Sequence, residues 1–284
     1  TVRGIGNLTI NSSRLYQLFK YTVYAFLTFN IYLFFDEEFA AAALQFPNGI
    51  DTLDIIEAYS ATIDTLAWVV LLLLFELETF VLDDDQFTRR TTWALHGLRA
   101  ICYAFIVYAF YGYIANLAFV VDTVPLAGIA DVCALLPGEW SWAPTLDEYV
   151  RITAANCGSW SEAGTFVQFR DLPAVVDAAG LAEIVRLAWV DVINAGVWLL
   201  VVLVLEIDVR LQEKNRLEGL ALRLSSAAKF VLYGTLFLAA IYWGIKGDFV
   251  DFWDAFLWLV AFVFIELNVF EWREEENLAL AAES

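Results

Sequence analysis

The sequence has few of the residues that build common catalytic and binding centres. Its 284 residues include one histidine, three cysteines and five prolines. Methionine is absent, and we attach no function to its absence. A single histidine and scattered cysteines exclude the usual zinc and haem ligand sets. Lysine and arginine total 16 against 35 aspartates and glutamates, so the clustered positive charge needed for phosphate binding is missing. We therefore expect no metal, no cofactor and no nucleic acid partner.

Recognisable catalytic and channel motifs are also missing from the sequence. There is no glycine-rich phosphate loop, no G-x-S-x-G, no H-E-x-x-H and no run resembling a potassium filter. The hydrophobic segments carry no ladder of arginines, so a voltage sensor is not supported. We do not expect an enzyme.

Hydrophobic residues dominate what is present. They make up 61% of the chain, aromatic residues 16%, and the mean hydropathy is +0.64. Because about 20 helical residues cross a hydrocarbon core of roughly 30 Å, several runs are long enough to span a bilayer. The sequence therefore predicts an all-α integral membrane protein whose main partner is the lipid bilayer. The polar start does not resemble a cleavable signal peptide, so the first span is expected to direct insertion.

Three hydrophobic runs share the same embedded marks. They align on Glu76, Glu206 and Glu266, and a tryptophan lies eight residues before each glutamate. The hydrophobic runs that precede them share a second pattern, in which Lys20, Arg99 and Lys229 are each followed four residues later by Tyr24, Tyr103 or Tyr233. The connections from Glu76 to Arg99 and from Glu206 to Lys229 have the same length. A repeated pattern of this kind predicts a repeat architecture.

We interpret the chain as six transmembrane helices in three tandem two-helix repeats. The repeats are parallel, because each holds an even number of spans, and a pseudo-threefold axis along the membrane normal would relate them. The expected spans are 16–35, 63–82, 93–121, 187–205, 229–245 and 249–270, with a loop at 36–50. The expected regions are a tail at 1–13, repeat 1 at 14–90, repeat 2 at 91–223 with an insertion at 122–186, repeat 3 at 224–272 and a tail at 273–284.

Most of the basic residues lie on the side of the membrane that holds the two termini. The positive-inside rule therefore predicts that both termini are cytoplasmic, in a bacterial or archaeal inner or cell membrane. The insertion 122–186 would then form a small extracytoplasmic cap, with short helices at Leu146–Ala155 and Ala174–Arg186. The outer side would also be strongly acidic, which either concentrates cations or reflects a salty exterior.

Cysteine placement agrees with this orientation. Cys133 and Cys157 both lie in the insertion, where an oxidising exterior would preserve a disulfide between them. The alternative is two unlinked thiols. Cys102 lies within a span and reads as a plain apolar side chain.

The repeated charges predict a layer at one depth near the cytoplasmic side. Lys20, Arg99 and Lys229 would pair with Glu76, Glu206 and Glu266, within a hairpin or between neighbours, and Tyr24, Tyr103 and Tyr233 could bond the carboxylates. Unpaired charges at this depth are costly. The layer would either tie the helices together or act as a charged gate.

A second set of polar residues lies 12 positions before the glutamates. Asp64, Asn194 and Asp254 each precede a tryptophan by one helical turn and would share its face, with Asp191 one turn before Asn194. They predict an outer cation site. The competing interpretation is helix capping at the outer interface. His96, near Arg99, is either part of a proton relay or a simple hydrogen-bonding group.

The plan of three two-helix repeats with intramembrane ion pairs resembles that of the mitochondrial carriers. The resemblance rests on these features alone. The family's P-x-[DE]-x-x-[KR] signature is missing, and no proline lies in any expected span. It implies no function here.

Two functional classes remain. One is a small cation-linked channel or transporter, whose route would be lined by the polar residues of spans one and three, such as Asn30, Tyr32, Tyr111 and Tyr113. The other is a non-catalytic structural or accessory subunit that binds a partner through its cap. A homo-oligomer or a membrane protein partner fits either class.

Overall fold

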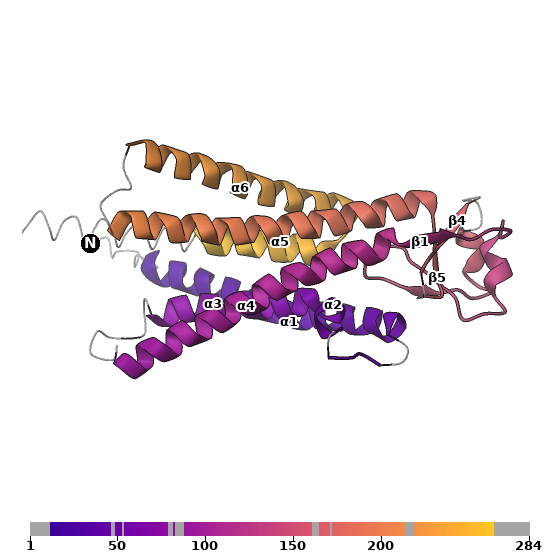
Figure 1. Cartoon of the computed structure of the whole chain (residues 1–284), viewed down its shortest axis with the longest axis horizontal. Coiled ribbons are helices and arrows are strands. Elements are labelled where there is room, and N and C mark those ends of the chain that lie inside the picture. Colours follow the sequence, from indigo (N-terminus) through magenta and orange to yellow (C-terminus); the bar gives the residue numbers. More distant parts are fainter. Residues whose placement is uncertain are drawn as a thin grey trace, which may run out of the picture.

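The computed structural model describes residues 12–46, 49–52, 54–78, 82, 88–160, 165–170, 172–213 and 219–263. The predicted tail 273–284, the end of the sixth expected span and nearly all of the tail 1–13 lie outside these residues. The described chain is mostly helical, with a small β-sheet unit at one end of a helical bundle (Figure 1).

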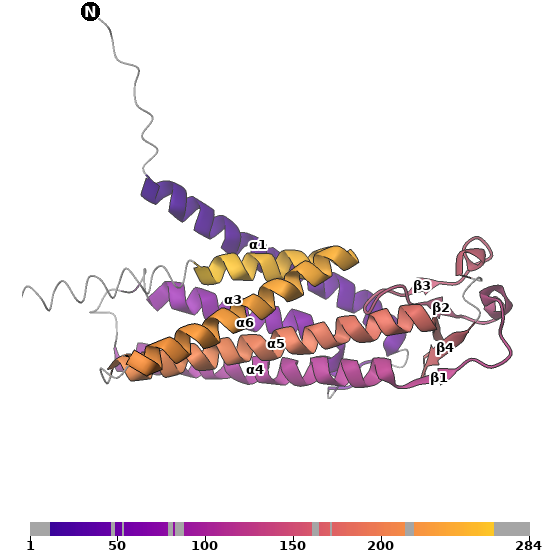
Figure 2. The same ribbon diagram turned by 90° about the horizontal axis from the view of Figure 1, so that it is seen from above.

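Long helices form the body of the molecule. Within the described residues, α1 (Ser12–Gln45), α4 (Arg89–Val121), α5 (Ala178–Glu213) and α6 (Gly219–Lys246) are the four that are long and apolar enough to cross a membrane. Two shorter helical stretches accompany them: α3 (Ser60–Glu76), preceded by the short α2 (Ile55–Ala58), and residues 249–263. Figures 1 and 2 show the helices running lengthwise alongside one another.

Successive helices pack against each other. Helix α3 contacts α1 and α4, and α5 contacts α4 and α6. Large apolar side chains such as Phe230, Ile245 and Phe237 remain more than half exposed on the outer surface of the bundle. An apolar surface of this extent suits a lipid environment rather than water.

Helix α1 continues through much of the expected loop 36–50, because it ends only at Gln45. The reason is local: Asp36-Glu37-Glu38 leads into Phe-Ala-Ala-Ala-Ala-Leu, and alanine, leucine and glutamate are strong helix formers. The loop prediction was therefore wrong over most of its length. The extension matters for function because it brings Glu37 and Glu38 to the wall of a cavity near the sheet unit.

The expected insertion forms a sheet unit, defined here as residues 122–177, which ends nine positions earlier than the expected 186 because α5 begins at Ala178. Its strands have the order β1-β4-β5-β2-β3, and within the described residues β2 and β5 pair in parallel while the other pairs are antiparallel. The strands are β1 (Thr123–Pro125), β2 (Ser141–Trp142), β3 (Val150–Arg151), β4 (Phe166–Phe169) and β5 (Ala174–Asp177), with 3₁₀ helices at Val132–Leu135 and Cys157–Trp160.

The all-α expectation is thus wrong in this unit, and so is the short helix expected at Leu146–Ala155. The helix expected at Ala174–Arg186 is confirmed only from Ala178 onward, where it is the start of α5. Val150 and Ile152 are β-branched and favour extended backbone, and β3 forms there. In the second segment, Val175 and Val176 follow Pro173 and form strand β5 before α5 begins.

The disulfide prediction is confirmed. Cys133 and Cys157 are bonded, with their Cα atoms 5.0 Å apart. The bond joins the two 3₁₀ helices of the sheet unit, and in the chain-entropy model a loop of this length contributes about 3 kcal/mol. One continuous hydrophobic core links the sheet unit with Ile184 of α5 and Trp243 of α6, so the unit packs directly against the bundle.

Candidate functional site

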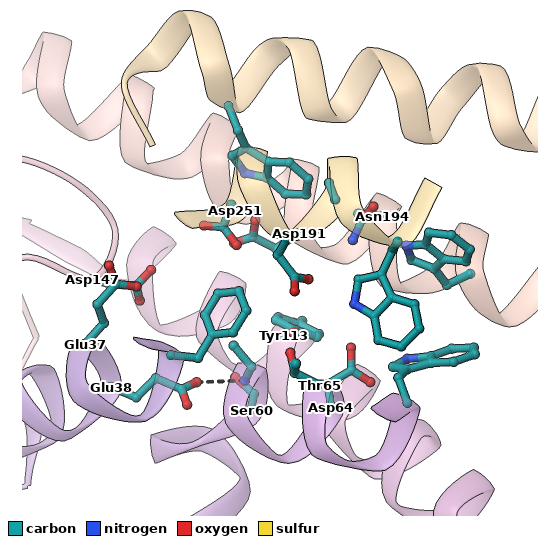
Figure 3. Close-up of a pocket in the computed structure, with 18 of the residues that line it drawn as sticks. Glu37, Glu38, Ser60, Asp64, Thr65, Tyr113, Asp147, Asp191, Asn194 and Asp251 are labelled. Carbon is teal, nitrogen blue, oxygen red and sulfur yellow. Dashed lines mark hydrogen bonds between the residues drawn. The ribbon is translucent and has the colours of Figure 1, made fainter. Parts of the chain in front are cut away.

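A cavity lies inside the bundle, close to the sheet unit. Its walls come from α1, α3, α4, α5, α6, residues 249–263 and the loop that carries Asp147. Figure 3 shows carboxylates from several of these elements pointing toward a common space. The cavity volume is about 70 Å³. One water molecule needs at least roughly 10–15 Å³ on this measure, so several water molecules or one small ligand can fit.

The four residues predicted for the outer cation site all line this cavity: Asp64, Asn194, Asp254 and Asp191. They come from three different helical segments that are distant in sequence. The capping interpretation does not fit Asn194 or Asp191, because α5 begins at Ala178, several turns earlier. The helices instead direct these polar side chains inward, toward one another.

The tryptophans one turn further along form the floor of the cavity. The ring centroids of Trp68 and Trp198 are 6.0 Å apart, and those of Trp68 and Trp258 are 6.1 Å apart. Phe262 closes the group, 4.6 Å from Trp198. All four side chains are buried and line the cavity. Beyond them an apolar cluster that includes Leu72, Val201 and Ala261 fills the bundle, so the floor is sealed.

Acidic side chains dominate the walls of the cavity. None of the described lining residues is a lysine, arginine or histidine. The carboxylates among them are Glu37, Glu38, Asp64, Asp147, Asp191, Asp251 and Asp254. Carboxylates confined together without a basic partner repel one another and lose hydration, so bound cations or protons must offset much of their charge.

Some of these carboxylates are held by specific hydrogen bonds. Glu38 accepts hydrogen bonds from the backbone N–H groups of Ala61 and Thr62, at 2.7 and 3.0 Å, and so caps the first turn of α3. Asp254 accepts a hydrogen bond of 2.7 Å from Asn30 Nδ2, and Asp64 lies within hydrogen-bonding reach of Trp68. These contacts fix the geometry but bring no positive charge.

Two buried polar atoms on the cavity wall have no hydrogen-bond partner among the described residues. They are Asn194 Oδ1, an acceptor, and Trp243 Nε1, a donor. Asp191 lies near Trp243, but the geometry does not complete a hydrogen bond. Such atoms are costly to bury unless water or a ligand satisfies them, so the cavity is built to hold polar contents.

A second cavity of about 490 Å³ adjoins the first and shares Glu37, Asp147 and Asp251 with it. It lies between the end of α1, the loop of the sheet unit and the turn after α6, and Asp36, Glu148 and Asp248 add further negative charge to its lining. The shared carboxylates mark the neck between the two cavities. The larger cavity therefore forms an acidic funnel that leads to the smaller one.

Asp147, on a loop of the sheet unit, lines the region that the two cavities share. Burial of its carboxyl, and then the nearby charge of Asp248, raise the pKa of Asp147 from 3.8 to about 7. Between pH 3.8 and about pH 7, the folded protein thus binds more protons at Asp147 than the unfolded chain does. Its stability consequently falls as pH rises through that window.

We expect Asp147→Asn to flatten this pH dependence. Thermal unfolding of the purified protein from about pH 5 to about pH 8 should show wild type losing ~1–2 kcal/mol more than the variant, after allowing for the partial exposure of the side chain. Glu139→Gln, in an exposed ion pair with Arg151 on the same unit, serves as the matched control. Equal slopes for wild type and Asp147→Asn would contradict the assignment.

The charged layer predicted near the other end of the bundle is organised around Lys20. Its Nζ lies 2.6 Å from Glu76 Oε1, and both side chains are buried. Tyr21 donates a hydrogen bond of 3.0 Å to the same carboxylate, and the hydroxyl of Tyr24 lies 3.5 Å from its other oxygen. This pair joins α1 to α3.

The other two cations pair with different acids from those predicted. Arg99 bonds Glu78, and Lys229 lies 3.3 Å from Asp208. The predicted partner Glu206 instead forms an exposed pair with Arg210, and Glu266 lies outside the described residues. Both observed pairs have a sequence separation of 21 residues. The first joins α4 to the residues that directly follow α3, and the second joins α6 to α5. Tyr103 is 41% exposed, and Tyr233 packs near Phe262.

The polar residues expected to line a route mostly face outward. Tyr32 and Tyr111 are 58% and 59% exposed on the bundle surface. Asn30 and Tyr113 do reach the interior: Asn30 bonds Asp254, and Tyr113 lines the cavity. His96 is exposed and bonds the Thr92 carbonyl, which fits the simple hydrogen-bonding interpretation. The Asp/Asn and Trp positions that line the cavity lie on the second helix of each expected pair, namely α3, α5 and residues 249–263.

Sequence reasoning missed several lining residues, among them Glu37, Glu38, Asp147, Asp251 and Trp243. The acidic run before an alanine-rich stretch could have indicated that α1 continues with its carboxylates facing the bundle. Asp251 lies one turn before Asp254, as Asp191 lies before Asn194, and that repetition was visible in the sequence. No local signal marks Asp147, because only the tertiary fold of the sheet unit brings it to the cavity.

Among the described residues, no group of three histidine, cysteine, aspartate or glutamate side chains is arranged to hold a metal ion. The chain matches no protein-family model, no curated protein and no solved structure.

Proposed function

We propose that this protein binds small cations in the acidic cavity and moves them across a membrane, as a channel or transporter. The observation that carries the proposal is the set of carboxylates around the cavity with no basic residue among its described lining residues. If these carboxylates served only to hold helices together, each would be expected to pair with a basic residue. A cavity lined by carboxylates without a basic partner, next to a second acidic cavity, instead attracts and concentrates cations.

The proposal includes the finer architecture expected from the repeats. Six spans, with α3 and residues 249–270 completing the set, would form three parallel hairpins around a pseudo-threefold axis. The contact of Trp68, Trp198 and Trp258, which occupy equivalent sequence positions, supports such an axis. Both termini would be cytoplasmic, the sheet unit would be an extracytoplasmic cap, and the funnel would open outward.

In this arrangement the described conformation is closed toward the cytoplasm. The tryptophan floor and the apolar cluster beyond it exclude water, as in a hydrophobic gate. The ion pairs of Lys20, Arg99 and Lys229 lie on the far side of that barrier. Opening would have to separate the tryptophans, and the acidic funnel would then supply cations from outside.

Cation flux into proteoliposomes tests the proposal. Wild-type protein should carry a monovalent cation faster than empty liposomes, and Asp64→Asn combined with Asp254→Asn should lower that flux by on the order of tenfold, since two of the cavity charges are removed without changing side-chain volume. Asp122→Asn, in an exposed ion pair with Arg170 on the sheet unit, is the matched control.

A second candidate function is an accessory membrane subunit that binds a partner through the sheet unit. The sealed tryptophan floor favours it, because a closed core needs no pathway. Wild-type flux equal to that of empty liposomes, together with co-purification of a membrane protein partner, would leave this second function as the correct one.

A further inference from the structure

We infer that the cation bound in the cavity is a small primary alkylammonium ion rather than an inorganic cation. The inference rests on the proposed function and names its substrate class. The ammonium group would lie among the carboxylates, and the hydrocarbon part would contact the aromatic floor.

The arrangement of the acids disfavours a directly coordinated metal ion. Calcium and similar ions need several oxygen ligands at about 2.0–2.6 Å around one point. The described residues provide no group of three acidic, histidine or cysteine side chains in such an arrangement. Both oxygens of Glu38 and one oxygen of Asp254 already accept hydrogen bonds from protein groups, which leaves fewer free oxygens for a metal ion.

The aromatic floor supplies what an organic cation requires. Trp68, Trp198, Trp258 and Phe262 line the cavity together, directly below Asp64 and Asp254 along their helices. Tryptophan attracts organic cations over its ring face more strongly than the other aromatic side chains, and a desolvated site strengthens the attraction. The same rings bury the apolar part of an alkyl chain, which an inorganic ion lacks.

The unpaired polar atoms of the wall match the donors of a primary ammonium group. Its three N–H donors can bond carboxylates and also Asn194 Oδ1, which has no partner among the described residues. Trp243 Nε1, on a side chain that is 3% exposed, can donate to a water molecule that accompanies the ligand. The cavity volume of about 70 Å³ restricts the ligand to a few heavy atoms.

The test is an exchange titration on the purified full chain in detergent. Sodium chloride is replaced by propylammonium chloride at constant ionic strength, and tryptophan fluorescence and heat of binding are followed. We expect propylammonium to bind about tenfold or more tightly than sodium, given a desolvated cation–π contribution. The neutral analogue 1-propanol should cause no saturable change. Equal binding of sodium and propylammonium, or saturable binding of 1-propanol with the same affinity, would overturn the inference.

Two variants locate the site. Trp258→Phe keeps an aromatic ring and should weaken propylammonium binding by about threefold or more while leaving sodium binding unchanged. Asp254→Asn should weaken both cations, whereas Glu139→Gln on the sheet unit should weaken neither. If Trp258→Phe has no effect but Asp254→Asn weakens sodium, the inference fails and the proposed function stands. If Asp254→Asn changes the binding of neither cation, both the inference and the proposed function fail.

Discussion

We expect Lys20→Met to destabilise the protein by about 3–5 kcal/mol, because it leaves the buried Glu76 without its counter-charge. The Lys20 side chain is 2% exposed and that of Glu76 8%, so little water can replace the lost ammonium group. Tyr21 still donates a hydrogen bond to the carboxylate but brings no positive charge. The free energy of unfolding in detergent, measured by reversible denaturation, gives the result.

Two further variants separate charge loss from packing. The double variant Lys20→Met with Glu76→Leu removes both charges and should recover to within about 1–2 kcal/mol of wild type, since a buried pair adds little over an apolar pair of similar size. Arg210→Met breaks the exposed pair with Glu206 and should cost about 1 kcal/mol or less. Similar losses for Lys20→Met and Arg210→Met would mean that the buried pair is not an organising contact.

We expect Trp68→Ala to open a leak through the proposed barrier. Trp68 touches both other tryptophans, so its removal leaves a void at the centre of the cavity floor. A hydrophobic constriction excludes ions by dewetting, and polar contents above the void would readily wet it. Cation leak across proteoliposomes should rise by on the order of tenfold or more, while stability falls by about 3–5 kcal/mol.

Trp189→Ala is the matched control, because Trp189 lies on α5 but is 51% exposed and outside the cavity lining. It should leave the leak at the wild-type level. Trp68→Phe keeps a ring in the floor and should show an intermediate leak with a smaller loss of stability. A folded Trp68→Ala protein with unchanged leak would show that the tryptophans do not form the barrier.

The sequence predicted the depth of the charged residues along their helices. It did not predict which acid pairs with which base. Hydropathy placed Lys20 and Glu76 at similar depths, and they do pair. Glu78 lies two residues after Glu76, only about 3 Å further along the helix, so depth alone cannot decide which acid Arg99 meets. Rotation of each helix about its axis decides that, and this depends on packing against neighbours.

The repeated Asp/Asn and Trp positions line the same cavity, as expected for residues one turn apart that share a helix face. What the sequence concealed was the remainder of the lining. Glu37 reaches the site only because α1 continues past the expected loop, and Asp147 arrives from a sheet whose strands are two to four residues long. Strands this short carry almost no periodic signal, and their pairing is a tertiary property.

The most direct measurement of the central claim is proton release on cation binding. In weakly buffered detergent solution, a cation that enters the crowded cavity should displace protons shared among its carboxylates, so the solution acidifies as the cation is added. Wild type and Asp122→Asn should release protons with the same saturable dependence, and the Asp64→Asn, Asp254→Asn double variant should release markedly fewer. The account is contradicted if wild type releases none, or if the double variant releases as many.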